Sequence, residues 1–399
     1  MNKHLKCVIF GDRDVIKNDN QLPEFKRLIG FLVDKNIKPV ILSNDLTQER
    51  QLLEIQLKQD YPQLAWYITA RDNLPKKSKG EAVSSILDKL EIEPRKAIYV
   101  GNSDIDMQTA VNSKLLFLNA TWYGENTDYG FKFFTPKEIA RFIDIFCLRD
   151  NLWAYCINEG GLEYYALGIY AYLEKQYDYS SDAKDAAKYG TGHPEFWIKY
   201  LLSTVYLSGL HERIDYIAPY PGHKQGSIPT VMEKTIVTFA KCCRKKYLKD
   251  LIVRHTTATK SSWARNNKQP ITHFNQLNTI HLNPTPAQNI EGKVYKKNPL
   301  NSKKTVLVID DFCTEGYSLE AARNFIEQTG AKVILISLLK TIFKNYGRID
   351  DLGKFDPCNP CQFSNVGKTR IYPFNSYLIE KSAHQEIRSK LQEYDSWHW

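Results

Sequence analysis

The sequence predicts an α/β protein with two parallel-sheet domains, and three observations support this fold class. The chain has 399 residues, enough for two or three domains of ordinary size. Short apolar runs alternate with amphipathic stretches at 1–150 and again at 214–345, as expected for parallel strands joined by helices. Apolar residues make up 43% and charged residues 25% of the chain, which is typical of a folded globular protein.

Residues 1–150 supply the first predicted sheet. Its expected strands lie at 6–10, 39–42, 64–68, 97–100 and 115–118. Its expected helices lie at 22–35, 47–58, 80–90, 104–112 and 135–146, the last with a Thr cap and Pro in the first turn.

The rest of the chain divides into a helical segment, a second sheet and an extension. Residues 151–213 are rich in tyrosine and are expected to be helical, with a break at Tyr189-Gly-Thr-Gly-His-Pro194. The segment 255–290 has no periodicity, which is typical of a functional or a disordered segment. The extension 346–399 is expected to begin with a loop at 346–375 and to close with a helix at 376–394. Its last residues, Asp395 to Trp399, are expected to dock on the body of the protein or on a second subunit. The second sheet is expected to contain strands 214–218, 251–254, 305–309 and 332–338 with helices 228–243 and 319–329.

Composition also restricts where the protein works. The longest apolar runs are too short to cross a bilayer, and the first residues lack a secretory cleavage pattern, so no membrane partner is expected. Eight cysteines in a chain of this length do not form a disulfide framework. These features together predict a cytoplasmic protein with reduced thiols.

The net charge of +9 is concentrated in one region. Residues 240–304 contain fourteen Lys and Arg against two acids, a net charge of +12. Such a concentration indicates an anionic partner: a polyphosphate, a nucleic acid or an acidic surface.

The strongest motif is Val306-Leu-Val-Ile-Asp-Asp-Phe-Cys-Thr-Glu-Gly-Tyr-Ser318, which precedes a predicted helix. Four apolar residues predict a buried strand, and two carboxylates follow at its carboxyl end, where open α/β sheets bind ligands. The Thr-x-Gly-x-Ser turn offers backbone N–H groups, hydroxyls and a helix N-terminus to one anion. The plainer interpretation is a strand that ends in a polar turn.

This motif resembles the phosphoribosyl pyrophosphate (PRPP) motif of type I phosphoribosyltransferases, and the layout is most similar to their ComF and amidophosphoribosyltransferase branch. The resemblance implies that Asp310 and Asp311 hold the ribose hydroxyls, with Mg²⁺ as cofactor. Glu315 stands where the family often has threonine. The 5-phosphate would be wrapped by Thr314, Glu315, Gly316, Tyr317 and Ser318.

Two further parts of that family have counterparts here. Asp215-Tyr-Ile-Ala-Pro-Tyr-Pro-Gly-His-Lys-Gln-Gly-Ser227 supplies a strand and a loop, in which Gly222, Lys224 and Ser227 would bind pyrophosphate. The stretch 255–290 would be a cationic lid. Its cations, in or beside it, are Arg254, Lys260, Arg265 and Lys268, of which Arg254 and Lys260 would bind the phosphates of PRPP. Helices at 151–213 would form a hood over the acceptor, with Tyr189, His193 and Trp197 as candidates.

Residues 1–150 resemble the haloacid dehalogenase (HAD) superfamily, whose members transfer phosphoryl groups through an aspartyl-phosphate. The resemblance rests on Phe10-Gly-Asp-Arg-Asp14, Ile41-Leu-Ser-Asn44, Ser78-Lys-Gly-Glu-Ala82 and Tyr99-Val-Gly-Asn-Ser-Asp-Ile-Asp106. It implies Asp12 as nucleophile, Asp14 as acid/base, Ser43 and Lys79 as phosphate ligands, and a Mg²⁺ site that includes Asp12, Asp14, Asn102 and Asp106.

Two interpretations of this first domain stay open. In one, it is an uncapped phosphatase. In the other it is a degenerate ligand-binding or scaffolding domain, because Val15 replaces a glycine and Asn102 replaces a metal-binding aspartate. A register one residue earlier also places Gly11 at the nucleophile position and Arg13 at the acid, which gives an inactive site.

The resulting hypothesis is a Mg²⁺-dependent phosphoribosyltransferase that acts on PRPP, a nucleotide or a nucleobase, preceded by the HAD-like domain; both domains would be Rossmann-like. A homodimer is compatible with it, and the basic region would then be a polyphosphate site. The alternatives are a nucleotide-modifying effector of a stress-response or antiphage system, a non-catalytic regulator that binds PRPP or a nucleotide, and a nucleic-acid-binding protein. Cys358-Asn-Pro-Cys361 is a single Cys-x-x-Cys pair, too few ligands for a structural zinc site by itself.

Overall fold

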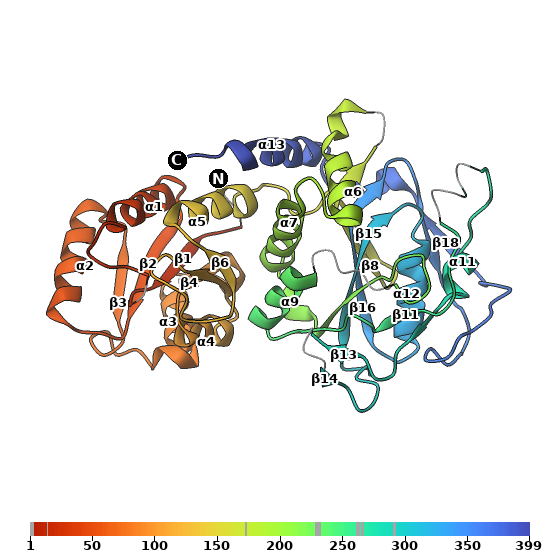
Figure 1. Cartoon of the computed structure of the whole chain (residues 1–399), viewed down its shortest axis with the longest axis horizontal. Coiled ribbons are helices and arrows are strands. Elements are labelled where there is room, and N and C mark those ends of the chain that lie inside the picture. Colours follow the sequence, from red (N-terminus) through yellow and green to blue (C-terminus); the bar gives the residue numbers. More distant parts are fainter. Residues whose placement is uncertain are drawn as a thin grey trace.

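The protein contains two six-stranded sheets that lie side by side (Figure 1). The computed structural model describes residues 4–13, 15–171, 174–227, 233–260, 264, 267–289 and 293–399. Among these residues, no helix combines the length and the apolar character needed to span a membrane. The α/β class with a Rossmann-like parallel sheet is confirmed.

The first sheet is parallel throughout and has the strand order β3-β2-β1-β4-β5-β6. Helices α1, α2 and α5 pack on one face, and α3 and α4 pack on the other. Side-chain caps begin three of the helices: Thr47 caps α2, Ser103 caps α4 and Thr135 caps α5. The strands are β1 (Cys7–Gly11), β2 (Lys38–Ser43), β3 (Ala65–Ile68), β4 (Ala97–Gly101), β5 (Leu116–Ala120) and β6 (Phe131–Phe133), and the helices are α1 (Leu22–Asp34), α2 (Gln48–Asp60), α3 (Glu81–Lys89), α4 (Asp104–Asn112) and α5 (Pro136–Phe142), with short turns η1 (Lys77–Lys79), η2 (Pro94–Lys96) and η3 (Ile143–Cys147).

The second sheet has the order β10-β9-β15-β16-β8-β7, and only β7 is antiparallel to its neighbour. Two of its strands, β7 (Tyr155–Glu159) and β8 (Leu162–Tyr170), lie in the segment expected to be helical, so that expectation is wrong for these residues. The apolar run of β8 is buried on both faces, and such a run has no period that separates strand from helix. The other strands of this sheet are β9 (Tyr216–Pro219), β10 (Lys246–Tyr247), β15 (Thr305–Cys313) and β16 (Lys332–Thr341).

Helices and small hairpins surround the second sheet. The predicted strand 251–254 forms as β11, but it pairs with β12 in a separate two-stranded sheet. The expected loop 346–375 also contains two paired strands, β17 and β18. The bounds are β11 (Ile252–Arg254), β12 (Ile280–Leu282), β13 (Ala287–Gln288), β14 (Lys293–Val294), β17 (Tyr346–Ile349) and β18 (Thr369–Tyr372), with helices α6 (Tyr179–Tyr189), α7 (Pro194–Leu207), α8 (Leu210–Arg213), α9 (Glu233–Cys242), α11 (Phe274–Leu277), α12 (Tyr317–Glu327) and α13 (Ala383–Ser396), and turns η4 (Lys175–Tyr177) and η5 (Phe374–Ser376).

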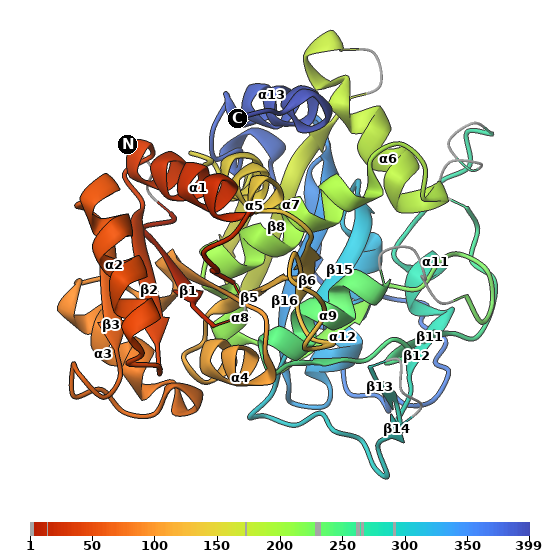
Figure 2. The ribbon, with the colours of Figure 1, turned by 60° about the vertical axis from the view of Figure 1, so that its left-hand side comes forward.

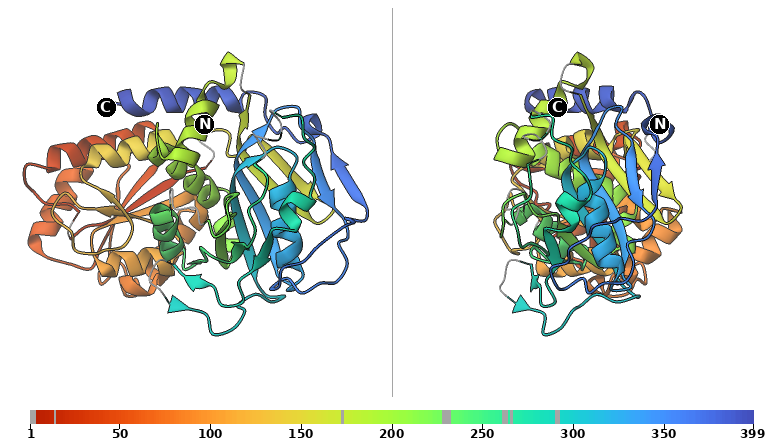
Figure 3. Two further views of the ribbon diagram at one scale, coloured as in Figure 1. Left: turned by 45° about the vertical axis from the view of Figure 1, so that its right-hand side comes forward. Right: turned by 90° about the vertical axis from the view of Figure 1, so that its right-hand side faces the viewer.

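The two sheets share one hydrophobic core, because α7 and α9 pack between them (Figures 1 and 2). The Tyr206 hydroxyl donates to the carbonyl of Ala97 across this junction. Helix α13 lies over both sheets, and the indole N–H of Trp397 donates to Asp144 of the first domain at 2.9 Å (Figure 3). The predicted docking of the C-terminal residues on the body of the protein is therefore confirmed.

Candidate functional site

The site in the second sheet is built from loops that follow two neighbouring parallel strands. Strands β9 and β15 pair in register, with Pro219 opposite Ile309, so their carboxyl ends meet at one edge of the sheet. The backbone N–H of Tyr220 donates to the carbonyl of Ile309 at 2.8 Å, which holds the first residue of the loop after β9 beside β15. The acidic motif 306–318 and the predicted pyrophosphate loop 215–227 therefore lie at the same edge of the sheet.

Asp310 and Asp311 lie within β15, which is longer than the expected 305–309. Both side chains are half-buried, and the backbone N–H of Asp311 donates to the Asp310 carboxylate at 2.8 Å. Burial, followed by the negative charge of Asp311, raises the pKa of Asp310 well above its ordinary value. Adjacent carboxylates with such a shift favour a site that gains a cation or a hydrogen-bond donor when a ligand binds.

The turn after β15 has the geometry that an anion-binding turn requires. Gly316 is the N-cap of α12 with a φ of 89°, a conformation that favours glycine. A Cβ at this position would also lie 2.6 Å from the Tyr346 ring, so both the backbone and the space require glycine. No side chain caps this helix, which leaves its first-turn N–H groups to a ligand or to water. The Thr314 hydroxyl lies 3.1 Å from that of Thr341, and Ser318 is half-buried in the first turn of the helix.

Glu315 has a neighbour that was not predicted from the sequence. Lys340 is completely buried beneath the turn, and its amine donates to the carbonyls of Thr314, at 2.6 Å, and Lys344. Burial lowers the pKa of Lys340, and the nearby charge of Glu315 acts in the opposite direction. Burial and a hydrogen bond to Glu315 raise the pKa of Tyr317 to about 12. Glu315 therefore contacts Tyr317 and lies near a buried cation, which offsets its negative charge in the turn.

The loop after β9 is fixed to the segment that follows β11. The N–H of Gly226 donates to the carbonyl of Arg254, and the N–H of Ala258 donates to the carbonyl of His223, at 2.9 and 2.8 Å. The predicted phosphate contacts Gly222 and Lys224 are exposed in this loop, and Ser227 is half-buried.

Arg254 differs from the prediction that it belongs to a cationic lid. Its side chain is 2% exposed, and its N–H groups donate to the carbonyl of Gly222 and to the side chains of Thr279 and Gln276. An arginine whose donors are directed at protein acceptors supports the loop from below and does not face a ligand. The predicted phosphate ligand Lys260 is exposed, and Arg265 lies outside the described residues.

Cations gather at this edge around His223. Burial lowers the pKa of His223, and the charges of Lys260, Lys224, Arg254 and Lys188 lower it further. Lys188 comes from α6, and its amine lies 4.0 Å from the Asp311 carboxylate and 4.8 Å from the centre of the Phe312 ring. No sequence motif pointed to Lys188, and only the fold brings it to the acidic pair; His223 lies in the predicted pyrophosphate loop but was not among its predicted contacts.

The candidate residues of the hood have other partners. Tyr189 is 67% exposed. His193 lies between the carboxylates of Asp182 and Asp395, at 2.8 and 2.7 Å, and the indole of Trp197 is buried and donates to Asp182. His193 and Trp197 therefore join α6 and α7 to the C-terminal helix, whereas Lys188 is the residue of this segment that approaches the acids.

In the first domain, the predicted nucleophile Asp12 lies just after β1 and is 2% exposed. The Ser43 hydroxyl donates to its carboxylate at 2.6 Å, so these two predicted site residues do meet. Burial raises the pKa of Asp12, and the nearby charge of Lys77 offsets this only in part. Asp14, the predicted acid/base, lies outside the described residues.

The lysine of this site is Lys77, which corrects the prediction of Lys79. The short turn η1 separates the two side chains: Lys79 is exposed, whereas the buried Lys77 amine contacts the Asp106 carboxylate at 2.6 Å. Burial by itself would raise the pKa of Asp106, but the charge and hydrogen bond of Lys77 outweigh it and leave the pKa below its ordinary value. Arg50 lies 3.6 Å from Asp12, so each carboxylate has a cation beside it.

Three of the residues proposed for Mg²⁺ in the first domain, Asp12, Asn102 and Asp106, are described by the structure, and all three are engaged with protein groups. The Asn102 side-chain oxygen accepts from the N–H of Asn126, and its amide donates to the carbonyl of Gly124. Asp106 is surrounded by donors from Lys77, Tyr99, Ser103 and the Asn102 backbone, at 2.6 to 3.2 Å. Among the described residues, no group of three His, Cys, Asp or Glu side chains is placed to hold a metal.

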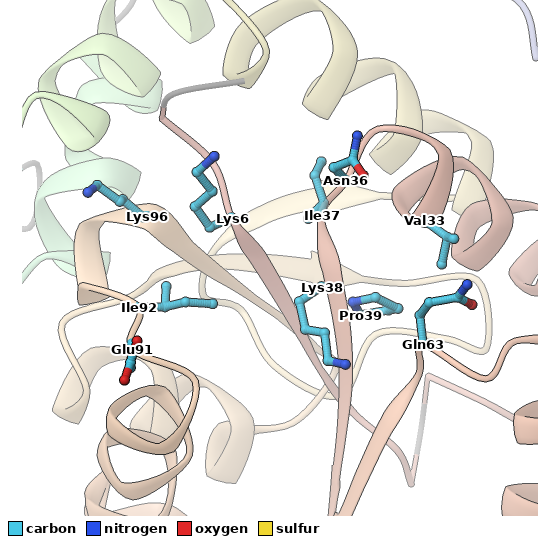
Figure 4. Close-up of a pocket in the computed structure, with 10 residues that line it drawn as sticks. All are labelled: Lys6, Val33, Asn36, Ile37, Lys38, Pro39, Gln63, Glu91, Ile92 and Lys96. Carbon is cyan, nitrogen blue, oxygen red and sulfur yellow. The ribbon is translucent and has the colours of Figure 1, made fainter. Parts of the chain in front are cut away.

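Two further features, the Cys358 and Cys361 pair and a cavity in the first domain, do not form a ligand site among the described residues. Cys358 and Cys361 are free and partly buried, and the part of the chain that the structure describes brings no third metal ligand to them. A cavity of about 480 Å³ opens at the amino end of the first sheet, away from Asp12. The amines of Lys6, Lys38 and Lys96 at its wall point in different directions and do not converge on one ligand (Figure 4).

Comparison with known proteins gives partial structural similarities. No family model matches the chain, and no curated protein matches it. A HAD-superfamily hydrolase of subfamily IA from Geobacter sulfurreducens PCA is 15% identical; the match covers 34% of this chain and 94% of that one, with a TM-score of 0.25. The core domain of a candidate phosphoglycolate phosphatase from Streptococcus pneumoniae TIGR4 is 13% identical, with 36% and 98% covered and a TM-score of 0.29.

A further candidate phosphoglycolate phosphatase, from Lactobacillus delbrueckii subsp. bulgaricus ATCC BAA-365, is 21% identical with a TM-score of 0.26. The match covers 30% of this chain and only 52% of that protein, so this chain spans about half of its length. The resemblance of the second domain to phosphoribosyltransferases remains a prediction from the sequence motifs.

Proposed function

We propose that the second domain binds PRPP, or a nucleotide formed from it, at the carboxyl edge of its sheet and catalyses Mg²⁺-dependent phosphoribosyl transfer. One observation carries the proposal: two adjacent carboxylates, an uncapped helix N-terminus and a group of cations from three separate segments lie at one edge. The carboxylates are Asp310 and Asp311, and the free N–H groups belong to the turn 314–318. The exposed cations are Lys188, Lys224 and Lys260.

Each group has a distinct task in this proposal. The turn 314–318 holds the 5-phosphate by its N–H groups, and Asp310 and Asp311 accept hydrogen bonds from the ribose hydroxyls. Lys224 and Lys260 bind the diphosphate group. The C–O bond between the anomeric carbon and the diphosphate breaks, the diphosphate leaves with the electron pair, and a nucleophile of the acceptor forms the new bond to that carbon.

The donor set of this edge fits a Mg²⁺ ion that arrives with the diphosphate. Asp310 and Asp311 are hard oxygen ligands, and burial together with the Asp311 charge raises the pKa of Asp310, while Lys188 lies 4.0 Å from Asp311. When bound, the ion would supply charge stabilisation for the departing diphosphate. Lys188, Lys224 and Lys260 act on the same charge from the protein side.

Calorimetric titration with PRPP and Mg²⁺ tests the proposal. The wild type should bind, and the Asp310→Asn/Asp311→Asn variant should lose at least about tenfold in affinity because the ribose hydroxyls and Mg²⁺ lose their charged acceptors. The matched control is Asp350→Asn/Asp351→Asn, another adjacent acid pair, which follows β17. Equal affinity in the wild type and the site variant, or no binding by the wild type, contradicts the proposal.

We propose that the HAD-like first domain is a non-catalytic scaffold. Its two buried carboxylates, Asp12 and Asp106, are balanced by Arg50 and Lys77, and the side chain of Asn102 is engaged with protein groups. Phosphate release from p-nitrophenyl phosphate with Mg²⁺ tests this. Activity in the wild type that disappears in Asp12→Asn would show an active phosphatase instead.

A further inference from the structure

Most of the basic region that dominates the net charge lies away from the proposed PRPP site. Its exposed cations include two where strands of the second sheet begin: Lys246 starts β10, and Lys303 precedes β15. In a parallel sheet these positions share the amino edge, opposite the carboxyl edge that holds Asp310. We define the cationic ridge as Lys245, Lys246, Lys293, Lys296, Lys297, Lys303 and Lys304.

Contacts between elements make the ridge one continuous surface. The N–H of Asn289, next to β13, donates to the carbonyl of Tyr247 in β10 at 2.7 Å. The rings of Tyr216 and Tyr295 meet edge to face at 6.2 Å, which joins the segment after β14 to β9. Lys304 lies 5.8 Å from the centre of the Tyr216 ring. The hairpin β13–β14 projects from the body of the protein at this edge (Figures 1 and 3).

The ridge has more positive charge than its surroundings neutralise. The nearby Asp215 is engaged with Lys304 and with the N–H of Thr305, and Asp250 accepts from the N–H of Ala287. The remaining exposed lysines of the ridge have no carboxylate within 4.0 Å among the described residues. These side chains are Lys246, Lys293, Lys296, Lys297 and Lys303.

We propose that the cationic ridge binds the phosphate backbone of a nucleic acid, a function separate from that of the PRPP site. Lys293 in the projecting two-stranded ribbon and Lys296 and Lys297 just after it match the closely spaced charges of a polynucleotide, and each bound phosphate releases counterions. The half-buried Tyr295 ring beside these lysines offers a surface for base stacking. A membrane surface fits less well, because the ridge consists of strand ends and a hairpin and not of an amphipathic helix.

Fluorescence anisotropy with a labelled single-stranded RNA and a labelled DNA duplex, measured over a range of salt concentrations, tests this proposal. Wild-type affinity for at least one probe should fall steeply and linearly with the logarithm of salt concentration. The variant Lys293→Gln/Lys296→Gln/Lys297→Gln should bind more weakly by at least about tenfold, with a shallower salt slope by about one unit for each lost phosphate contact.

The matched control removes three exposed lysines elsewhere, Lys354→Gln/Lys368→Gln/Lys381→Gln. This variant has the same net charge, so it separates a local surface from general attraction. Equal losses in both triple variants, or no wild-type binding to either probe, would overturn the proposal. Binding to anionic vesicles that competes away the nucleic acid and depends on the same lysines would assign the ridge to membranes instead.

A second variant guards against damage to the hairpin. Lys246→Gln/Lys303→Gln changes the strand ends only and should also weaken binding; unchanged affinity would contradict the continuous ridge. PRPP binding should remain in both ridge variants, and nucleic-acid binding should remain in Asp310→Asn/Asp311→Asn. The two proposals can therefore fail independently.

Discussion

The carboxyl edges of the two sheets both carry a pair of acids, but the two pairs differ in their surroundings. Asp12 and Asp106 of the first domain are buried, and a cation lies beside each within 3.6 Å. Asp310 and Asp311 are half-buried, and their nearest cation, Lys188, lies 4.0 Å from Asp311. Acids at the end of a strand therefore do not define a site by themselves. The first edge is neutralised by the protein, whereas the second leaves charge for a ligand to complete.

The strongest test of this comparison is Lys77→Met in the first domain. The change leaves Asp106 buried without its cation, and breaking a buried ion pair in this way costs about 3–5 kcal/mol. The free energy of unfolding, measured with urea, should fall by that amount. Lys79→Met is the control, because this exposed lysine lies two residues away and should change stability by less than about 0.5 kcal/mol. Similar values for both variants would mean that the first edge is not a closed, charge-balanced cluster.

The corresponding change in the second domain, Lys340→Met, should affect binding more than stability. Lys340 is buried without a close carboxylate, and its desolvation cost offsets its bonds to Thr314 and Lys344. Loss of the amine frees the Thr314 carbonyl and removes positive charge beneath the turn. The PRPP dissociation constant should rise about tenfold, or ~1.4 kcal/mol, with a smaller loss of stability than for Lys77→Met.

Lys344→Met is the control for this experiment, since its side chain is exposed and only its carbonyl contacts Lys340. Titration calorimetry gives the dissociation constants, and urea unfolding gives the stabilities. A Lys340→Met variant that unfolds easily but binds PRPP normally would make Lys340 a structural residue of the same kind as Lys77.

The same two edges show what the sequence could predict. Strand–helix alternation located both parallel sheets, and the acidic motif gave the position of Asp310 and the turn, because these depend on neighbours in the chain. Strand β8 was missed because a strand buried on both faces and a buried helix have similar composition, and its short partner β7 was missed with it. Tyrosine content favoured helices there, but pairing with β16 decides the structure.

Site residues that depend on tertiary contacts could not be predicted. Lys77 and Lys79 both precede a helix, and only the course of the turn decides which one is buried. Arg254 looked like a lid residue, but the fold places it beneath the loop at Gly222. Lys188 reaches Asp311 from a helix more than a hundred residues earlier in the chain.

A smaller effect is expected for Lys188→Ala, which tests whether α6 contributes to the second edge. The Lys188 side chain is 41% exposed, and its amine lies at the distance limit of an ion pair with Asp311, so water and salt screen its charge. PRPP affinity should fall about threefold at low salt, and the difference should shrink as salt is added. Lys184→Ala, one turn earlier on the same helix, is the control. A larger effect from Lys184 would place the diphosphate elsewhere along α6.

The smallest expected effect concerns pH and the attachment of α13. A hydrogen bond to Asp182, followed by one to Asp395, raises the pKa of His193 above its ordinary value. A group whose pKa is higher in the folded state stabilises that state below the unfolded pKa, and this contribution is lost as pH rises through the folded pKa. Because the imidazole is about one-third exposed, the contribution should stay below about 1 kcal/mol.

Urea unfolding of the wild type and His193→Gln on either side of neutral pH measures this contribution. The wild type should be the more stable protein at mildly acidic pH, and the difference should decrease toward alkaline pH as the imidazolium loses its proton. The Trp197 bond to Asp182 does not titrate and should persist in both proteins, so α6 and α7 stay joined while the bond to α13 weakens. If the difference grew with pH instead, neutral His193 would be the form that holds α13. The attachment of α13 would then depend on Trp397 and its neighbours and not on the ion pair between His193 and Asp395.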